Sequence, residues 1–427
     1  MERYKEYKDS GVQWIGEIPI HWDCVQFRGL FNITKRIAGK TGYDVLAVTQ
    51  KGIKVKDVES NEGQIASDYS KYQLVDPGDF AMNHMDLLTG FIGISPQIGV
   101  TSPDYRVFKN ISSKANSKFY LFLFEMCYKQ RIFYGLGHGV SNKGRWRLPA
   151  PIQNKFCIPL PPVDEQEKIV SYIESKTSKI DEYIVEKEKV VQLLNELKEA
   201  EIAKVVTQGL NPNVKMKDSG ASWIGMIPEH WEMKRVNTFL SERKEKYNGD
   251  DSLSILSLLK GIGVIPYEEK GNVGNKAKED LSTYKITRKG DVVVNCMNVI
   301  IGSSGITDYD GYISPAYYSF IPKNKEMSIL YKHWLSLPQM HGAIRCMAKG
   351  ILEIRLRVSS QQLLSMKIPV PPLNEQRAIV DYINEKTAKV ESLITDLQAE
   401  IEHLKEYKQR LIADCVTGQV NVQNETI

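Results

Sequence analysis

The chain changes character within one stretch, which reads Ile158-Pro159-Leu160-Pro161-Pro162-Val163-Asp164-Glu165-Gln166. The proline cluster cannot continue a helix, but residues 163–208 contain neither Pro nor Gly. Apolar residues recur there at helical spacing, so the stretch predicts a long helix that Asp164 caps and Gly209 ends. At about 1.5 Å per residue the helix is roughly 65 Å long, too long for the interior of one ordinary domain.

The same stretch returns 210 residues later, as Ile368-Pro369-Val370-Pro371-Pro372-Leu373-Asn374-Glu375-Gln376. It again leads into a segment with helical apolar periodicity, which ends at Val416-Thr417-Gly418. The two copies align over this length without a gap. The chain is therefore a tandem duplication in which each copy ends in a long helix.

A second repeat precedes each copy's globular part. The segment Lys8–Trp22 returns as Lys217–Trp231, with 11 of 15 positions identical, both Trp included. These Trp are expected to be packing anchors rather than a stacking platform for bases.

Between the repeats the sequence alternates in short apolar runs broken by Gly, Asp and Asn, which predicts mostly β structure. Strands are expected at 43–49, 52–58 and 79–82 and, in the second copy, at 253–259, 263–267 and 291–295. Helical segments are expected at 117–134 and 327–347. Both copies also share a Gly-Asp strand, Gly78-Asp79 and Gly290-Asp291.

The predicted fold class is α+β, with two mixed, mostly β domains separated by two long helices. If the copies are related by an approximate two-fold axis, the usual relation between paired copies, the helices run antiparallel as a coiled-coil spacer. The expected boundaries are 1–163 for the first domain, 164–208 for the first helix, 209–374 for the second domain, and 375–427 for the second helix and tail.

Composition indicates a globular protein without a membrane span. The 427 residues are 42% hydrophobic and 25% charged, with a mean hydropathy of −0.32. There is no apolar run of about 18 residues and no apolar signal segment near Met1. The six Cys are scattered without a CxxC pair, which fits a reducing cytoplasm.

The charge is unevenly distributed. The net charge is +4, yet residues 164–206 carry −4 and residues 375–416 carry −3, so the remainder carries +11. Basic globular parts joined by acidic helices indicate that the globular parts meet a polyanion, for which duplex DNA is the natural candidate. The alternative, that surface lysines simply solubilise the protein, stays open.

Motifs for catalysis are not found. The sequence has no phosphate-binding GxxxxGK[ST] loop, no NPPY or DPPY segment of a methyltransferase, and no HExxH pair. In a duplicated chain this favours a non-catalytic binding subunit that holds no metal.

Taken together, these motifs resemble the specificity subunit of type I restriction-modification systems. The likeness rests on the two Ile-Pro-x-Pro-Pro-x-x-Glu-Gln helix starts, the Gly-Asp strands, and Trp-Ile-Gly-x-Ile-Pro-x-His-Trp at 14–22 and 223–231. It implies two target-recognition domains that each read one half of a split DNA sequence. It further implies two methyltransferase subunits and motor-nuclease restriction subunits as partners. S-adenosylmethionine, ATP and magnesium would then belong to those partners, with no cofactor in this chain.

Base-reading residues vary within this family, so the DNA-contact candidates come from side-chain chemistry. Arginine suits bidentate contact with phosphate or guanine, and asparagine suits adenine. The candidates are Lys143, Arg145, Arg147, Lys349, Arg355, Arg357, Asn83 and Asn295. The alternatives are an ion pair with a helix start for the arginines and turn capping for the asparagines. Subunit docking or helix capping is expected of Glu165, Gln166, Glu375 and Gln376.

Three other functions stay open. The first is a specificity subunit of a fused or smaller methylating system. The second is a coiled-coil scaffold with two protein-binding heads that ignores DNA. The third is a nuclease with an unrecognised site.

Overall fold

The structure is a computed structural model that describes residues 2–50, 52–57, 68–139, 146–250, 252–273, 276–278, 280–297, 302–348 and 357–424. The chain divides into two compact units. Unit 1 comprises Met1–Glu188 with Gln398–Ile427, and unit 2 comprises Lys189–Leu397. Each unit thus takes in part of both predicted long helices.

Unit 1 is built on an antiparallel four-stranded sheet of order β4-β11-β8-β9. The four antiparallel pairs β1-β2, β5-β6, β7-β10 and β3-β12 complete its strands. The strands are β1 Tyr7–Asp9, β2 Glu17–Pro19, β3 Asp23–Gln26, β4 Phe31–Thr34, β5 Leu46–Thr49, β6 Gly52–Val55, β7 Gln73–Val75, β8 Phe80–Met82, β9 Ile92–Ile94, β10 Gly99–Thr101, β11 Arg106–Asn110 and β12 Cys157–Leu160. The short helices are η1 Phe27–Gly29, α1 Ser117–Lys129, α2 Ile132–Gly135 and α3 Ala150–Lys155.

Unit 2 follows the same element order, as the duplication predicts. Its sheets have the orders β16-β23-β20-β21 and β18-β17-β22-β19, with the pairs β13-β14 and β15-β24 beside them. The strands are β13 Met216–Asp218, β14 Met226–Pro228, β15 Glu232–Arg235, β16 Leu240–Glu242, β17 Ser254–Leu259, β18 Gly263–Pro266, β19 Lys285–Thr287, β20 Val292–Asn295, β21 Ser304–Ile306, β22 Gly311–Ile313, β23 Tyr317–Pro322 and β24 Lys367–Val370. The short helices are η2 Val236–Thr238, η3 Tyr267–Lys270, α5 Lys325–Ser336, α6 Pro338–Met347 and α7 Ser360–Ser365. The expected strands and helical segments are thereby confirmed over the described residues.

The Trp segment is repeated because it forms the joint between each sheet and each long helix. In unit 1 the proline strand β12 pairs antiparallel with β3, directly after Trp22, and in unit 2 β24 pairs in the same way with β15. Trp22 and Trp231 are fully buried, and the ring of Trp14 stacks on Phe156 with centroids 5.2 Å apart. The prediction of packing anchors is confirmed.

The two long helices are α4, Val163–Gln208, and α8, Leu373–Val416. They begin one and two residues before the predicted boundaries. The carbonyl of Pro162 accepts the N–H groups of Glu165 and Gln166, so Asp164 lies in the first turn and its prediction as the cap is wrong. Gly209 has φ +75° and its N–H donates to Val205, which confirms the predicted stop.

Within each unit the two long helices pair antiparallel. In unit 1 Asp181 meets Lys408 at 2.6 Å and Lys187 meets Glu400 at 2.8 Å, so the partner number falls as the α4 number rises. In unit 2 Lys198 meets Glu391 at 3.4 Å, and Tyr382 donates to Glu201 at 2.6 Å. The predicted antiparallel direction is confirmed in each unit.

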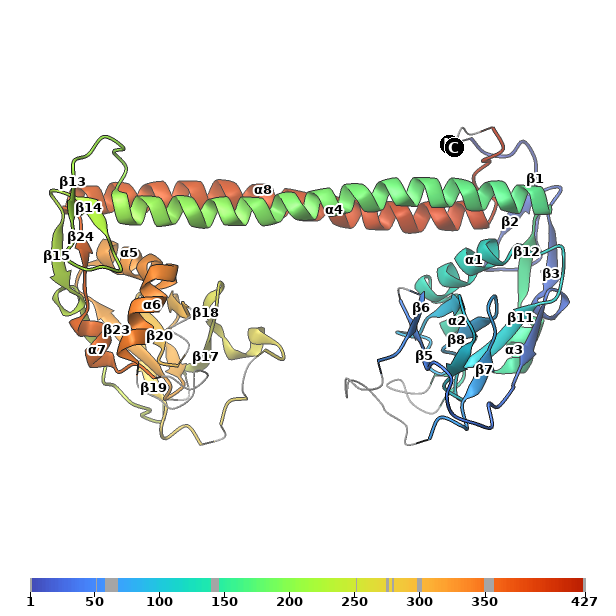
Figure 1. Ribbon diagram of the computed structural model, residues 1–427, viewed down its shortest axis with the longest axis horizontal. Coiled ribbons are helices and arrows are strands. Elements are labelled where there is room, and N and C mark those ends of the chain that lie inside the picture. Colours follow the sequence, from blue (N-terminus) through green and yellow to red (C-terminus); the bar gives the residue numbers. More distant parts are fainter. Residues whose placement is uncertain are drawn as a thin grey trace. The chain divides into compact units, whose positions relative to one another are not determined.

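The short helix α1 lies between the sheet of unit 1 and the long helices of that unit (Figure 1). One buried apolar cluster contains Phe80 and Phe108 of the sheet, Phe124 of α1, Ile173 of α4 and Leu411 of α8. Its counterpart α5 has the same place in unit 2, where Trp334 shares a cluster with residues of β20, α4 and α8. The end portions of the two long helices are therefore part of each unit's core.

The Gly-Asp strands owe their sequence to a turn and a buried ion pair. Gly78 and Gly290 have φ +88° and +90°, which L side chains rarely adopt. Asp291, which is 2% exposed, accepts bonds from Arg243 Nε at 2.6 Å and from Ser319 Oγ at 2.7 Å. In unit 1 Arg36 binds Asp79 at 2.6 Å. The motif therefore fixes the start of β8 and β20.

No helix in the described part of the chain is long and apolar enough to cross a membrane.

Candidate nucleic-acid interface

In unit 1 the predicted contact residues come together where β8 ends. Asn83 follows the strand, and its Oδ1 accepts the N–H of Met85 at 3.3 Å. The next carbonyl, of His84, accepts the N–H of Leu148 at 3.0 Å. Arg147 is therefore held beside this turn, and it also pairs with His138 through two backbone bonds of 2.8 and 3.0 Å. Its side chain is exposed.

Unit 2 repeats this arrangement at the end of β20. Asn295 Oδ1 accepts the N–H of Met297 at 3.0 Å. The carbonyl of Cys296 accepts the N–H of Val358 at 3.2 Å, which holds the exposed Arg357 beside the turn. Both units thus place one exposed arginine against an asparagine turn. Both asparagines cap their turns through Oδ1, which is the alternative role that the sequence suggested for them. Their contact with DNA stays a prediction.

The buried side chain of Arg106 stabilises the segment of unit 1 that contains Arg147. Arg106, which is 8% exposed, donates to the carbonyl of Leu148 at 2.8 Å and to Gln153 Oε1 at 2.6 Å. Burial lowers the pKa of Arg106 to about 10. Burial, together with the charges of Arg106 and Arg147, lowers the pKa of His84 to about 4. His84 is therefore neutral near pH 7, and the positive charge of this site resides on the arginines.

The low pKa of His84 makes unit 1 sensitive to acid. The ordinary pKa of histidine is about 6.5, so between pH 6.5 and 4 the unfolded chain binds a proton that the folded unit does not. Stability therefore falls as the pH is lowered through this window. His84→Gln should flatten the pH dependence of the melting temperature, followed by calorimetry. His403→Gln, at an exposed position on α8, is the control. An unchanged slope in the His84 variant would contradict this assignment.

Several predicted site residues cannot be placed. Lys143, Arg145, Lys349 and Arg355 lie outside the described residues. Arg147 and Arg357 form no ion pair with any described residue, so the alternative of an ion pair with a helix start is wrong for them. The helix-start carboxylates have other partners, which are described next.

The Glu-Gln pairs at the helix starts join elements within their own units. Glu165 accepts hydrogen bonds from Tyr4 and, at 2.9 Å, from His21. Glu375 accepts from His230 at 2.7 Å and from Trp231 at 3.0 Å. These bonds explain why the His-Trp dipeptide recurs together with the Glu-Gln helix start.

The glutamines of these pairs are buried. Gln166 Oε1 accepts the N–H of Asn116, the N-cap of α1, at 2.7 Å, and its Nε2 donates to Lys114 and Pro161. Gln376 accepts from Asn324 at 3.1 Å and donates to Pro371 at 2.7 Å. Gln166 and Gln376 are 0% and 4% exposed, so their side chains serve internal contacts. Their expected role in subunit docking stays a prediction.

Sequence reasoning missed two cations that are buried or half-buried. Arg106 and Lys285 follow no repeat or motif, because their partners are distant in sequence. Lys285, for example, donates to the carbonyl of Tyr317 at 2.7 Å and lies 4.6 Å from the ring centroid of Tyr318. Burial lowers its pKa. A lysine within a buried strand was the only available signal.

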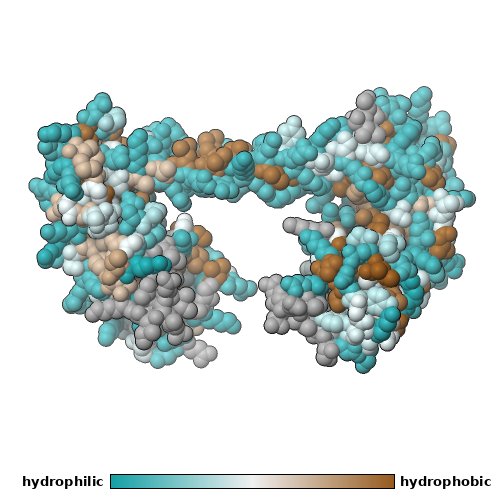
Figure 2. Space-filling view, viewed as in Figure 1, coloured by the Kyte–Doolittle hydropathy of each residue, from teal (hydrophilic) through white to brown (hydrophobic). Residues whose placement is uncertain are grey.

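The helix pair of unit 2 exposes apolar side chains. Leu193, Leu197 and Leu393 are 52%, 61% and 52% exposed. Figure 2 shows apolar side chains gathered on this part of the helix pair among hydrophilic ones. A groove of about 260 Å³ beside Leu197 is lined by residues of both helices, including Ile202 and Tyr382.

The chain is similar in sequence to proteins of type I restriction systems. The family described as "Type I restriction modification DNA specificity domain" matches residues 228–403. The chain is 23% identical, over 99% of both sequences, to the putative type I restriction enzyme MjaX specificity subunit of Methanocaldococcus jannaschii. It is 26% identical to the type I restriction enzyme MjaVIII specificity subunit of the same organism, over 62% of this chain and 63% of that protein.

Solved structures share the fold. A chain from work on complex assembly and conformational transition of the type I R-M system aligns with a TM-score of 0.67 at 16% identity, over 94% of this chain and 99% of that one. The HsdS subunit from Thermoanaerobacter tengcongensis aligns with a TM-score of 0.50 at 18% identity, over 94% and 98%. The chain is therefore similar over its whole length to a specificity subunit of type I restriction enzymes, and residues 228–403 match the model of their DNA specificity domain.

Proposed function

We propose that this chain reads a bipartite DNA sequence for a type I restriction-modification complex, with one unit for each half-site. The single observation that carries the proposal is the repeated site, in which an exposed arginine, Arg147 or Arg357, is held beside an asparagine turn in each unit. An arginine contacts guanine or phosphate through a rigid fork of donors, and an asparagine matches adenine. Two copies of one such site suit a split target.

The charge distribution supports DNA as the ligand. The helices carry net negative charge and the remainder of the chain carries +11. Lysine and arginine at a DNA surface displace counterions from the phosphates, so binding should weaken steeply with salt. A scaffold with two protein-binding heads would not bind DNA in this salt-dependent way.

The helices are proposed to bind the partner subunits. The exposed leucines of unit 2 and the groove beside them form an apolar surface on an otherwise acidic helix pair. Apolar surface of this kind marks protein interaction sites. The expected partners are methyltransferase subunits, which would transfer methyl groups to adenine, and motor-nuclease subunits. Catalysis would belong to these partners, not to this chain.

Selection from a random duplex library tests the proposal. The full chain, co-expressed with its methyltransferase subunit, should enrich sequences with two fixed half-sites separated by a gap of constant length and free sequence. A steep loss of binding between about 50 and 200 mM salt should accompany it. Enrichment of no sequence, or of one uninterrupted site, would contradict reading by two units.

A further inference from the structure

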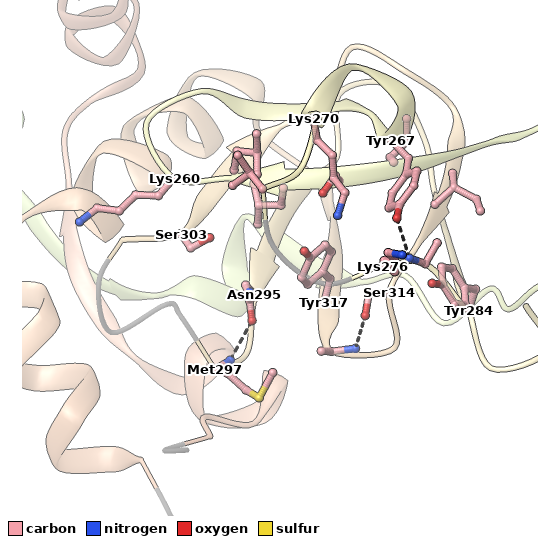
Figure 3. A pocket seen from close by; sticks show the side chains of 18 residues that line it. Lys260, Tyr267, Lys270, Lys276, Tyr284, Asn295, Met297, Ser303, Ser314 and Tyr317 are labelled. Atoms are coloured by element: carbon pink, nitrogen blue, oxygen red, sulfur yellow. Dashed lines mark hydrogen bonds between the residues drawn. The ribbon is translucent and has the colours of Figure 1, made fainter. Parts of the chain in front are cut away.

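The turn after β8 carries a different central side chain from its counterpart in unit 2. It reads Asn83-His84-Met85, whereas the turn after β20 reads Asn295-Cys296-Met297. In both turns the N–H of the methionine donates to the asparagine Oδ1, and Figure 3 shows this bond in unit 2. The two copies of the site therefore share their framework and differ in the residue at its centre.

The side chain on the neighbouring strand differs as well. On β11, Arg106 lies opposite Met82, the residue before the first turn. On β23, Tyr318 lies opposite Val294, the residue before the second turn. Arg106 and Tyr318 therefore hold corresponding places. Unit 1 combines a histidine with a buried arginine where unit 2 combines a cysteine with a tyrosine.

The imidazole of His84 carries one proton, and its surroundings determine which nitrogen holds it. Burial and the charges of Arg106 and Arg147 lower the pKa of His84 to about 4, so the ring is neutral near pH 7. The Nδ1 atom is buried and has no hydrogen-bond partner in the described parts of the chain. An N–H buried without an acceptor is rare, because it loses its bond to water and gains none in return. The proton is therefore on Nε2.

The Nε2 atom is the nitrogen of this ring that can reach a ligand. His84 is half-buried, and Nε2, in contrast to Nδ1, keeps access to solvent without donating to any residue that the structure describes. The carbonyl of His84 accepts the N–H of Leu148 at 3.0 Å, which places the ring beside the exposed Arg147. An unused N–H donor thus lies next to the arginine that is predicted to contact DNA.

The acidic residue of this turn does not compete for the donor. Asp86 Oδ1 accepts the N–H groups of Leu88 and Thr89 at 3.0 Å each, and Oδ2 accepts the hydroxyl of Thr89. The carboxylate is thereby engaged within its own turn. The donor at Nε2 is left for an acceptor that comes from outside the chain.

We propose that His84 is a further DNA-contact residue of unit 1, whose Nε2–H donates to an acceptor atom of the bound half-site beside Arg147. This inference rests on the proposed function. Two acceptors share the chemistry: a purine N7, which every base pair presents in the major groove, and a phosphate oxygen. Cys296 is 6% exposed and a thiol is a weak donor, so unit 2 lacks this contact.

Duplexes that lack one acceptor at a time test the contact. The full chain with its methyltransferase subunit is titrated, by fluorescence anisotropy at about pH 8, with the selected duplex. This pH is above the ordinary pKa of histidine, so the ring stays neutral. Single purines are replaced by 7-deazapurines along the half-site that unit 1 reads. With the unmodified chain, one replacement should weaken binding about 5-fold, as the loss of one hydrogen bond predicts.

Variants of His84 connect that loss to the imidazole. His84→Cys introduces the residue of unit 2, and should weaken binding about 5-fold and abolish the response to the 7-deazapurine. His84→Gln retains an N–H donor and should bind within about 2-fold of the unmodified chain. His403→Gln, at an exposed position on α8, is the matched control and should change neither the affinity nor the response.

The outcomes separate this inference from the proposed function. A sensitive purine whose effect disappears in the His84→Cys variant assigns the contact to N7. A loss in that variant that is equal for all sequences, with no sensitive purine, assigns the contact to a phosphate. Sequence-specific binding that His84→Cys leaves unchanged overturns the inference and leaves the proposed function standing. If the complex binds no duplex specifically, the proposed function fails, and this inference fails with it.

Discussion

Replacement of Arg357 by alanine is expected to weaken specific binding of duplex DNA by about 10- to 100-fold, because an arginine contact with guanine discriminates by roughly 1–3 kcal/mol. Arg357 is suited to this contact because its backbone is held beside the Asn295 turn and its exposed side chain has no ion-pair partner among the described residues. Arg147→Ala should have a comparable effect in unit 1. Binding is measured by fluorescence anisotropy with the selected duplex at fixed salt.

The pattern of the loss identifies what the arginine contacts. If Arg357 reads guanine, discrimination is lost at one base pair, and Arg357→Lys does not restore it because lysine lacks the bidentate fork. If Arg357 contacts a phosphate, all sequences weaken alike and the salt slope falls by about one. Arg235→Ala removes an exposed arginine on β15 and serves as the matched control. If the Arg357 variant and the unmodified chain bind DNA with equal affinity, Arg357 does not contact the DNA.

Replacement of Asp291 by alanine is expected to destabilise unit 2 by about 3–5 kcal/mol, because Arg243 Nε and Ser319 Oγ lose their acceptor at a buried site and Arg243 keeps only the partly exposed Glu245. The Asp291 side chain is 2% exposed and that of Arg243 is 13% exposed. Asp291 also accepts the N–H of Arg288 at 3.0 Å, so its loss frees donors at the start of β20. Urea unfolding followed by circular dichroism measures the effect.

The duplication supplies a matched comparison for Asp291. Asp79→Ala breaks the corresponding pair in unit 1, but there the Arg36 side chain is 39% exposed and can be solvated. The Asp79 variant should therefore lose less stability than the Asp291 variant. Equal losses, or a loss under about 1 kcal/mol in the Asp291 variant, as is ordinary for an exposed pair, would show that the Gly-Asp motif does not depend on this ion pair.

The architecture was predictable because the repeats encode it locally. Proline clusters, long stretches free of Gly and Pro, and Gly209 mark where helices begin and end, and these signals need no distant partner. Because the two copies align at a constant separation of about 210 residues, the same elements were expected in both units. The misplaced cap at Asp164 arose because the carbonyl of Pro162 already accepts the first N–H groups of α4.

The candidate site was predictable only in part. Asn83, Asn295, Arg147 and Arg357 could be found because they recur at corresponding places in the two copies. Arg106 and Lys285 could not, since each acquires its role from contacts with residues far away in the chain. Unit 2 also contains a cavity of about 470 Å³, which is likewise a product of tertiary structure. Its lining joins β17, η3 and the turn before β23, which no local sequence pattern connects.

The central claim, that this chain directs a modification complex to a split DNA sequence, is tested most directly by methylation mapping. Single-molecule sequencing would compare the host genome with and without this gene. The account predicts that deletion removes one methylated-adenine motif made of two unlike half-sites separated by a gap, and that the intact gene restores it. A methylation map that does not change on deletion would contradict the claim.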